Sequence, residues 1–234
     1  MARLEKRRQS GRMISFPFPV PVDRPLEALC LGAHADDIEI GCGGTLLTLL
    51  GMVPVRVRWV VFSGEGKRAD EAARGAERFL GAAAESTVQM HDFPDGYMPA
   101  IRAELKDAVK AIAAGYERGF GPDLVFTHDE ADLHQDHALL GALTRETFRD
   151  HLVLGYEIPK VDGGLRSPNV YVPLEDSTAH EKVGLLLGAF PSQRSKHWFD
   201  PETFLGLMRL RGVECASPGR YAEGFHARKV VLGG

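Results

Sequence analysis

The sequence is poor in cysteine. Three cysteines, Cys30, Cys42 and Cys215, occur in 234 residues, and no two of them have C-x-x-C spacing. They are too few and too scattered for a disulfide framework or a thiolate cluster, so we expect reduced cysteines in a cytoplasmic protein. A metal site in this chain must therefore use histidine and carboxylate, donors that suit a hard or borderline cation such as Zn²⁺, Fe²⁺ or another divalent ion.

The chain also lacks a basic excess and a long apolar run. Its net charge of −4 and pI of about 6.1 carry none of the positive charge typical of nucleic-acid binding. No run approaches the roughly 18 apolar residues that cross a bilayer, and the basic ARLEKRRQSGR is followed by no apolar signal-peptide segment. We predict no nucleic-acid partner and no membrane span, and we expect residues 1–25 to form an N-terminal arm, loosely draped or disordered.

What the chain does have is enough apolar mass for a core, with 44% hydrophobic residues. Apolar stretches rich in valine alternate with amphipathic ones, which predicts strands alternating with helices. The expected strands are 26–33, 53–63, 86–93 and 123–128, and the expected helices are one from near Gly43, then 67–82, 100–119 and 134–152. This alternation predicts an α/β fold, Rossmann-like, with a mostly parallel sheet flanked by helices.

The rhythm weakens after residue 152. We expect a strand at 152–158, then a loop rich in glycine and proline, then a helix starting near Thr178, which has capping-box spacing to Glu181. A further helix should follow Pro201, and HARKVVL should be a final strand. Because no repeat or linker interrupts the chain, we predict a single α/β domain over 26–234, with this second half forming a wall of the substrate site.

Two polar loops follow expected strands. His34-Ala35-Asp36-Asp37 comes after the first, and LHQDH at 133–137 comes after the fourth. The carboxyl ends of parallel strands share one sheet edge, so these loops should meet. Two histidines and one aspartate there would match a catalytic zinc site with three protein ligands and one open position. A surplus acid and imidazole could then move protons, which indicates a metal-dependent hydrolase.

Taken separately, each motif has a plainer interpretation. An Asp-Asp pair is typical of a solvated turn or helix cap, and H-x-x-H often lies on a helix surface. The glycine-rich GCGGT at 41–45 raises a dinucleotide-binding alternative, but it is not G-x-G-x-x-G and the preceding acids would repel a pyrophosphate. Glycines there are better explained by close packing of the helix.

GAHADDIEIGCGGT resembles the first signature of the PIG-L/LmbE-like deacetylases, A-H-P-D-D-E, and LHQDH resembles their second, H-x-D-H. KRADEAARGAERFLG, HDFPDGYM and RYAEGF resemble further family features, so the similarity spans roughly 27–232 in the family's order. The resemblance implies an LmbE-like fold and zinc-dependent N-deacetylation of an N-acetylglucosamine-containing substrate, a small-molecule amino-sugar conjugate. The oligomeric state stays open, and a homo-oligomer is one of the possibilities.

The resemblance also implies residue roles. His34, Asp37 and His137 would be the metal ligands, and Asp36 the general base that activates the metal-bound water. His134 would stabilise the tetrahedral intermediate or protonate the leaving amine, and Asp136 would orient a neighbouring histidine.

This chain departs from the family pattern at three positions. Ala35 stands where proline is common, and the glutamate of the first signature is displaced to Glu39 because Ile38 follows the acids. Asp132 stands where some members carry a proton-donating tyrosine, so that role must be absent or filled from elsewhere.

Other polar residues are weaker candidates. Arg68 and Asp95 could contact the sugar, although Arg68 also suits an exposed helix start and Asp95 an Asp-Gly turn, and Glu223 could line the substrate pocket. The remaining histidines lack a partner at ligand spacing and are expected to be structural or on the surface, with a weak exception for His128 at a strand end: they are His91, His128, His151, His180, His197 and His226. The alternatives to deacetylation are a metal-dependent amidase or esterase for another acyl group, and a non-catalytic sugar- or nucleotide-binding module.

Overall fold

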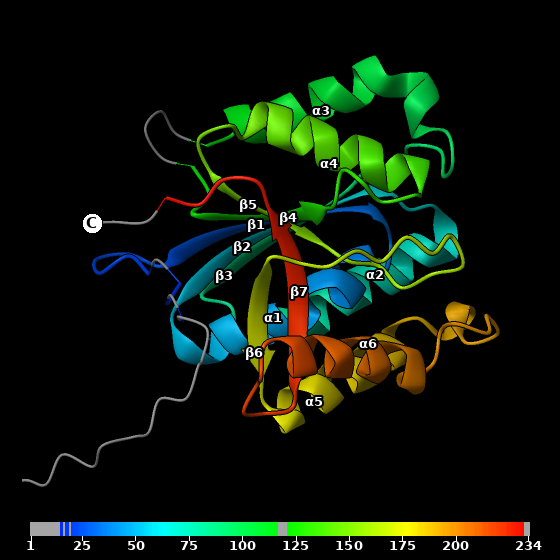
Figure 1. Cartoon of the computed structure of the whole chain (residues 1–234). Coiled ribbons are helices and arrows are strands. Elements are labelled where there is room, and N and C mark those ends of the chain that lie inside the picture. The colour runs from blue at the N-terminus through cyan, green and yellow to red at the C-terminus, as the bar shows by residue number, and fades with distance from the viewer. Residues whose placement is uncertain (1–14, 16, 19, 117–120, 232–234) are drawn as a thin grey trace, which may run out of the picture.

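The computed structural model describes residues 15, 17, 18, 20–116 and 121–231, and within them the chain forms a three-layer α/β fold (Figure 1). Seven strands make one sheet in the order β3-β2-β1-β4-β5-β7-β6. The strands are β1 Leu26–His34, β2 Val55–Ser63, β3 Glu85–Met90, β4 Leu124–His128, β5 Leu152–Tyr156, β6 Val170–Leu174 and β7 Tyr221–Ala227. β1 to β5 pair in parallel and β7 is antiparallel to both β5 and β6. The mostly parallel sheet predicted from the sequence is confirmed.

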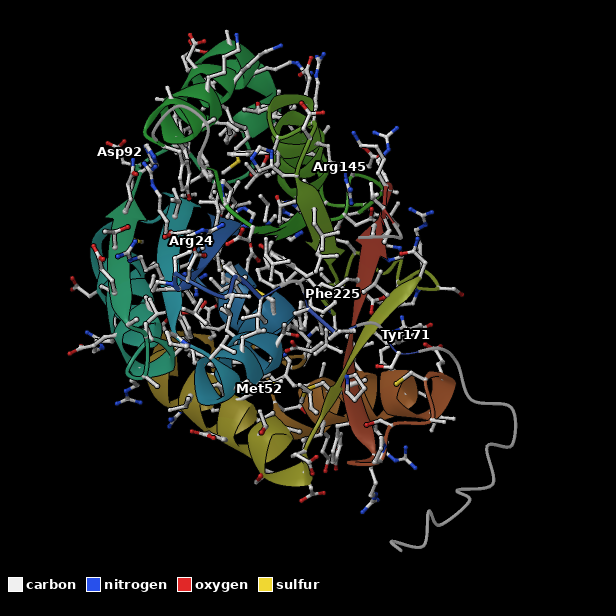
Figure 2. All side chains as sticks on the ribbon, turned by 90° about the vertical axis from the view of Figure 1, so that its left-hand side faces the viewer. Arg24, Met52, Asp92, Arg145, Tyr171 and Phe225 are labelled. Carbon is white, nitrogen blue, oxygen red and sulfur yellow. The ribbon has the colours of Figure 1, made fainter. Side chains whose placement is uncertain are left out.

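Helices cover both faces of the sheet. They are α1 Asp37–Met52, α2 Gly66–Phe79, α3 Arg102–Ala114, α4 Gln135–Thr147, α5 Asp176–Ala189 and α6 Pro201–Glu214, with short 3₁₀ turns at Met98–Ile101 and Pro191–Gln193. Leucine and valine side chains of α3 and α4 bury one face, and the other four helices bury the second (Figure 1). Figure 2 shows Phe225 of β7 in the interior, where it is fully buried, while the exposed Met52 ends α1 at the surface.

Helix α1 lies against the sheet, covered by α5, and its glycines permit that approach. A Cβ on Gly41 would lie 2.2 Å from the Tyr156 ring, and one on Gly43 would lie 2.5 Å from Phe79. Both separations are too short for a real side chain, so the sequence GCGG is explained by packing. The helix begins at Asp37, so the predicted start near Gly43 was wrong: these glycines lie inside the helix.

The second half corrects four further expectations. α4 ends at Thr147, short of the expected 152. α5 starts at Asp176 after Glu175 with no side-chain cap, so the capping box at Thr178 was wrong. The glycine- and proline-rich segment includes β6, and the last strand is Tyr221–Ala227, which shares only its last two residues with HARKVVL. YAEGFHA forms β7, which pairs with β5 on one side and β6 on the other and is largely buried, whereas Val231 is exposed.

Most of the predicted N-terminal arm, 1–25, lies outside the described residues. In the part that is described, Phe18 packs against the core and Arg24 donates two hydrogen bonds of 2.7 Å to the Asp123 carboxylate. Among the described helices, none combines the length and the apolar character that a membrane span requires.

Candidate active site

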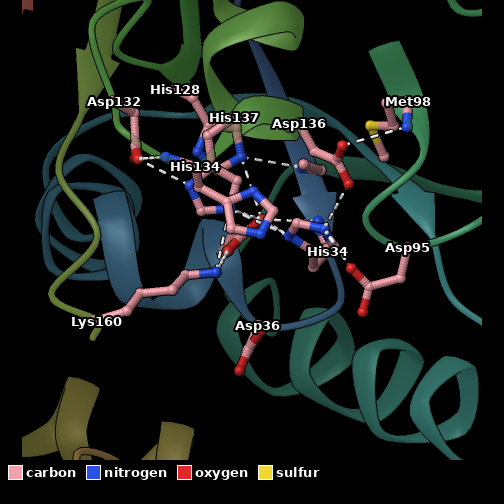
Figure 3. Close-up of polar contacts among 12 residues, drawn as sticks. His34, Asp36, Asp95, Met98, His128, Asp132, His134, Asp136, His137 and Lys160 are labelled. Carbon is pink, nitrogen blue, oxygen red and sulfur yellow. Dashed lines mark hydrogen bonds and ion pairs between the residues drawn. The ribbon is translucent and has the colours of Figure 1, made fainter. Parts of the chain in front are cut away.

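The two polar loops meet where the strand order reverses, between β1 and β4 (Figure 3). His34 is the last residue of β1, and Asp37 opens α1 directly after the N-cap residue Asp36. His134 is the N-cap of α4, and His137 lies in its first turn. The predicted meeting of the loops is confirmed, and it follows from the parallel pairing of β1 with β4.

Three donor atoms form a nearly equilateral triangle. His34 Nδ1 lies 3.1 Å from His137 Nε2 and 3.2 Å from Asp37 Oδ2, and His137 Nε2 lies 3.4 Å from the same oxygen. Tetrahedral zinc ligands at 2.0–2.1 Å are about 3.3–3.4 Å apart, so the triangle has the size of one face of a zinc tetrahedron. These residues could therefore hold a divalent cation with a fourth position left open.

Other donors surround this triangle. His34, His134 and His137 place one ring nitrogen each within 4.8 Å of one another, and so do the donor atoms of Asp37, His128 and His137. The Nε2 atom of His128 accepts the backbone N–H of Ala33 at 3.0 Å, which uses the lone pair that a metal would need. His134 stays available, since its Nδ1 has no hydrogen-bond partner among the described residues.

Carboxylates hold the far nitrogen of His34. Its Nε2 lies 3.3 Å from Asp136 Oδ2 and 3.0 Å from Asp95 Oδ1. Asp136 is itself fixed because its carboxylate accepts the backbone N–H groups of Gly96 at 2.7 Å and Met98 at 3.2 Å. A carboxylate on the distal nitrogen fixes the tautomer and orientation of a metal-binding histidine.

Asp132 does the same for His137. Its Oδ2 lies 2.9 Å from His137 Nδ1, and its Oδ1 accepts the backbone N–H of His134 at 2.8 Å. The second contact is an Asx turn that leads the chain into α4. The residue that replaces the family tyrosine thus contacts a histidine, and the tyrosine's role has to be sought elsewhere.

Carboxylates and imidazoles shift one another's pKa in this cluster. Burial opposes a charged His34, but Asp37, Asp136 and Asp95 outweigh it and raise the pKa of His34 to about 11. Burial likewise opposes ionisation of Asp37, yet His137, Lys160 and the other nearby histidines hold its pKa well below the usual range. Asp37 Oδ1 has no hydrogen-bond partner in the described part of the chain. A site of this kind favours an added cation.

Two residues at the site escaped sequence reasoning. His128 is fully buried and stacks on His137 with ring centroids 3.9 Å apart. Lys160, from the segment between β5 and β6, brings Nζ to 3.1 Å from His137 Nε2 and 3.7 Å from Asp37 Oδ1 (Figure 3). A histidine ending a strand was a weak signal for the first, but the irregular segment around Lys160 gave no pattern.

Three other predicted site residues, Asp36, Arg68 and Asp95, make polar contacts in or beside the cluster. Asp36 is buried and its Oδ1 accepts a 3.0 Å hydrogen bond from Arg68, so the predicted base and a predicted substrate contact form an ion pair. The Asp95 carboxylate, 76% exposed, contacts His34, and that hydrogen bond, against a smaller opposing effect of burial, lowers the pKa of Asp95 to about 2.

Glu223 faces helix α1. Its two oxygens accept the backbone N–H groups of Gly44 at 2.8 Å and Thr45 at 2.7 Å, and Lys182 Nζ donates to Oε1 at 2.6 Å. Lys182 also donates to the Ile40 carbonyl at 2.6 Å. Both oxygens are already bonded and the residue is only 4% exposed, which gives Glu223 a structural role; substrate binding by Glu223 stays a prediction.

Comparisons of sequence agree with this geometry. The model of the PIG-L family, described as GlcNAc-PI de-N-acetylase, matches residues 29–148, which include most of β1, the first loop and α4. The uncharacterized deacetylase YaiS of Escherichia coli K12 is 30% identical over 142 residues, covering 56% of this chain and 73% of that protein.

Comparisons of structure agree on the fold. The N,N'-diacetylchitobiose deacetylase of Pyrococcus horikoshii superposes with a TM-score of 0.68 at 21% identity, covering 91% of this chain and 87% of that one. GalB of Pseudomonas putida KT2440, a 4-carboxy-2-hydroxymuconate hydratase, superposes with a TM-score of 0.63 at 18% identity, covering 89% and 98%. The same fold thus carries different chemistries. From the family match over the site-bearing half and the relative at 30% identity, the chain belongs to the PIG-L family.

Proposed function

We propose that this protein is a metal-dependent hydrolase that removes the N-acetyl group from an N-acetylglucosamine-containing substrate. The observation that carries the proposal is the triangle of His34 Nδ1, Asp37 Oδ2 and His137 Nε2, with edges of 3.1–3.4 Å, next to a buried acid that is not part of it. Family membership and the deacetylase relatives support the acetamido substrate.

His34, Asp37 and His137 are the proposed ligands, and Zn²⁺ is the proposed ion, with Fe²⁺ or another divalent cation as alternatives. When bound, such a cation lowers the pKa of a water to about 7 and withdraws electrons from a carbonyl oxygen. Asp136 and Asp95 on His34, and Asp132 on His137, keep both imidazoles in the tautomer that turns a lone pair toward the triangle.

The protein's own side chains then move the protons. Asp36, at the N-cap of α1 and paired with Arg68, takes a proton from the attacking water. His134, whose ring centroid lies 5.0 Å from that of His34, lies on the opposite loop and delivers a proton to the departing nitrogen. Acetate and a free amine are the products. The reaction thus uses one acid from the first loop and one imidazole from the second.

Acetate release tests the proposal. Metal-loaded protein is incubated with a panel of N-acetylglucosamine conjugates, and acetate is measured by an enzyme-coupled assay. Asp36→Ala should lower the rate by roughly 10²–10⁴-fold with the metal retained, as expected for loss of a general base. Asp107→Ala, on the exposed face of α3, is the matched control and should leave the rate unchanged.

Two results would contradict the proposal. Release of a different acyl group, with acetamides untouched, would favour an amidase or esterase. Binding of the sugars with no turnover at any metal loading would favour a non-catalytic sugar-binding module.

A further inference from the structure

A lysine lies at the open side of the donor triangle. Lys160 Nζ is 3.1 Å from His137 Nε2 and 3.7 Å from Asp37 Oδ1, the carboxylate oxygen that is not part of the triangle. The Lys160 side chain is 16% exposed, whereas Asp37 and His137 are fully buried. The ammonium therefore reaches the donors from the side that faces solvent, which is the side a substrate must enter.

The segment that carries Lys160 is pinned at several points. Lys160 starts a tight turn. The Gly163 N–H donates a 3.2 Å hydrogen bond to the Lys160 carbonyl, and Gly163 has a positive φ of 71°. Gly164, also at positive φ, packs against Leu133, the residue before His134. Arg166 donates to Asp129 at 3.0 Å. The ammonium is thus held over the site by a segment tied to the loop after β4.

The other candidates for an oxyanion-stabilising group are engaged, except His134, which the proposed reaction uses to protonate the departing nitrogen. Asp132, at the position of the family tyrosine, contacts His137 and accepts the His134 N–H. Asp136 accepts two backbone N–H groups, and Arg68 is paired with Asp36. Among the described lysines and arginines, Lys160 is the one within 4 Å of both His137 and Asp37.

We infer that Lys160 is a catalytic residue that hydrogen-bonds the oxygen of the scissile acetamide and stabilises the oxyanion that develops there. The inference rests on the proposed deacetylase function and assigns the group that replaces the missing tyrosine. The water oxygen bonds to the carbonyl carbon while its proton passes to Asp36, and the C=O π pair moves onto the oxygen that Lys160 holds. That pair re-forms the C=O bond as the C–N bond breaks, and the nitrogen takes a proton from His134. Lys160 keeps its own protons throughout.

The test compares wild type with Lys160→Met, which keeps the aliphatic chain and removes the charge. Lys110→Met, an exposed change on α3, is the control. Removing one oxyanion donor should lower kcat by roughly 10²–10³-fold with little change in KM. Lys160→Arg should recover part of the loss. A thermal melt of each variant checks that the fold is intact.

A second readout does not depend on turnover. Acetate, whose oxygens resemble the oxyanion, is titrated into the Co²⁺-loaded protein and followed by its visible spectrum, and the Co²⁺ dissociation constant is measured alongside. Lys160→Met should bind acetate at least about tenfold more weakly, the effect of losing a hydrogen bond to a charged group. Its Co²⁺ affinity should be equal to wild type or tighter, because a competing positive charge is gone.

The outcomes separate the two proposals. If Lys160→Met equals wild type in kcat and acetate affinity, the role of Lys160 is overturned while deacetylation stands. If Co²⁺ affinity falls with kcat, Lys160 is a structural partner of Asp37 and the inference fails. If wild type releases no acetate, the deacetylase proposal fails, and the acetate titration alone decides whether Lys160 binds an oxyanion.

Discussion

Two buried clusters of charged residues lie at helix α1, and they differ in how their carboxylates are bonded. In the middle of the helix, the Glu223 carboxylate is bonded to Lys182 at 2.6 Å and to two backbone N–H groups. At the start of the helix, Asp37 shares its surroundings with three further carboxylates, and its Oδ1 has no hydrogen-bond partner among the described residues. The first cluster is balanced by the chain itself. The second gathers four carboxylates near one lysine, Lys160, and so favours an added cation, whereas the first is a structural contact.

The largest expected effect on stability comes from breaking the buried Glu223–Lys182 ion pair. Glu223→Gln leaves the Lys182 ammonium buried without its counter-charge, and breaking a buried pair costs about 3–5 kcal/mol of unfolding free energy. Urea unfolding measures the loss, with Glu202→Gln on the exposed start of α6 as control. The folded variant should release acetate at the wild-type rate. Normal stability with lost turnover would instead support the predicted substrate-binding role of Glu223.

A smaller effect should follow from loosening the site. Asp132→Asn keeps the shape of the side chain but weakens its hold on His137 Nδ1. Loss of such a supporting carboxylate typically costs 10–100-fold in metal affinity, or about 1.4–2.7 kcal/mol. Competition with a chelating dye measures the Zn²⁺ dissociation constant, and the melting temperature without metal should hardly change. Unchanged Zn²⁺ affinity would show that Asp132 does not support a ligand.

The smallest expected effect on stability comes from the Arg24–Asp123 ion pair, which is partly exposed to solvent. Burial opposes ionisation of Asp123, but hydrogen bonds from Arg24 and the Glu27 N–H outweigh it and lower the pKa of Asp123. A lowered folded pKa adds stability above the unfolded value of about 3.9, and this is lost as pH falls through the folded pKa. Because Arg24 is one-third exposed, Asp123→Asn should cost at most about 1 kcal/mol at pH 7.

Urea unfolding from pH 7 to pH 3 should bring the Asp123→Asn variant and the wild type together. A gap between them that widens toward low pH would reverse the sign of the argument.

The site was readable from sequence because its residues lie at the ends of regular elements. Strand–helix alternation predicted a parallel sheet, and a parallel sheet brings the residues after β1 and β4 to one edge. His34, Asp37, His134 and His137 could therefore be brought together from spacing alone. The same argument could not separate His134 from His137, whose roles came from the family resemblance.

Lys160 was not predicted as a site residue because its segment has no helical or strand periodicity. Lys160 sits in an irregular segment, and what places its ammonium is tertiary: the Gly163 turn, the packing of Gly164 on Leu133, and the Arg166–Asp129 pair. The structural contacts of Glu223 could not be predicted because its partners Lys182 and the Gly44 N–H lie 41 and 179 residues away along the chain. The start of α1 was misplaced because glycines usually weaken a helix, whereas here they let it pack on Tyr156 and Phe79.

Metal content tests the central claim most directly. Wild type, Asp36→Ala and Asp37→Ala are purified, loaded with Zn²⁺, dialysed and assayed for zinc by mass spectrometry. If His34, Asp37 and His137 hold the cation that the cluster lacks, wild type and Asp36→Ala retain one zinc per chain and Asp37→Ala retains none. Equal zinc in Asp37→Ala, or loss of zinc from Asp36→Ala alone, would contradict the assignment of one aspartate to the metal and its neighbour to the proton.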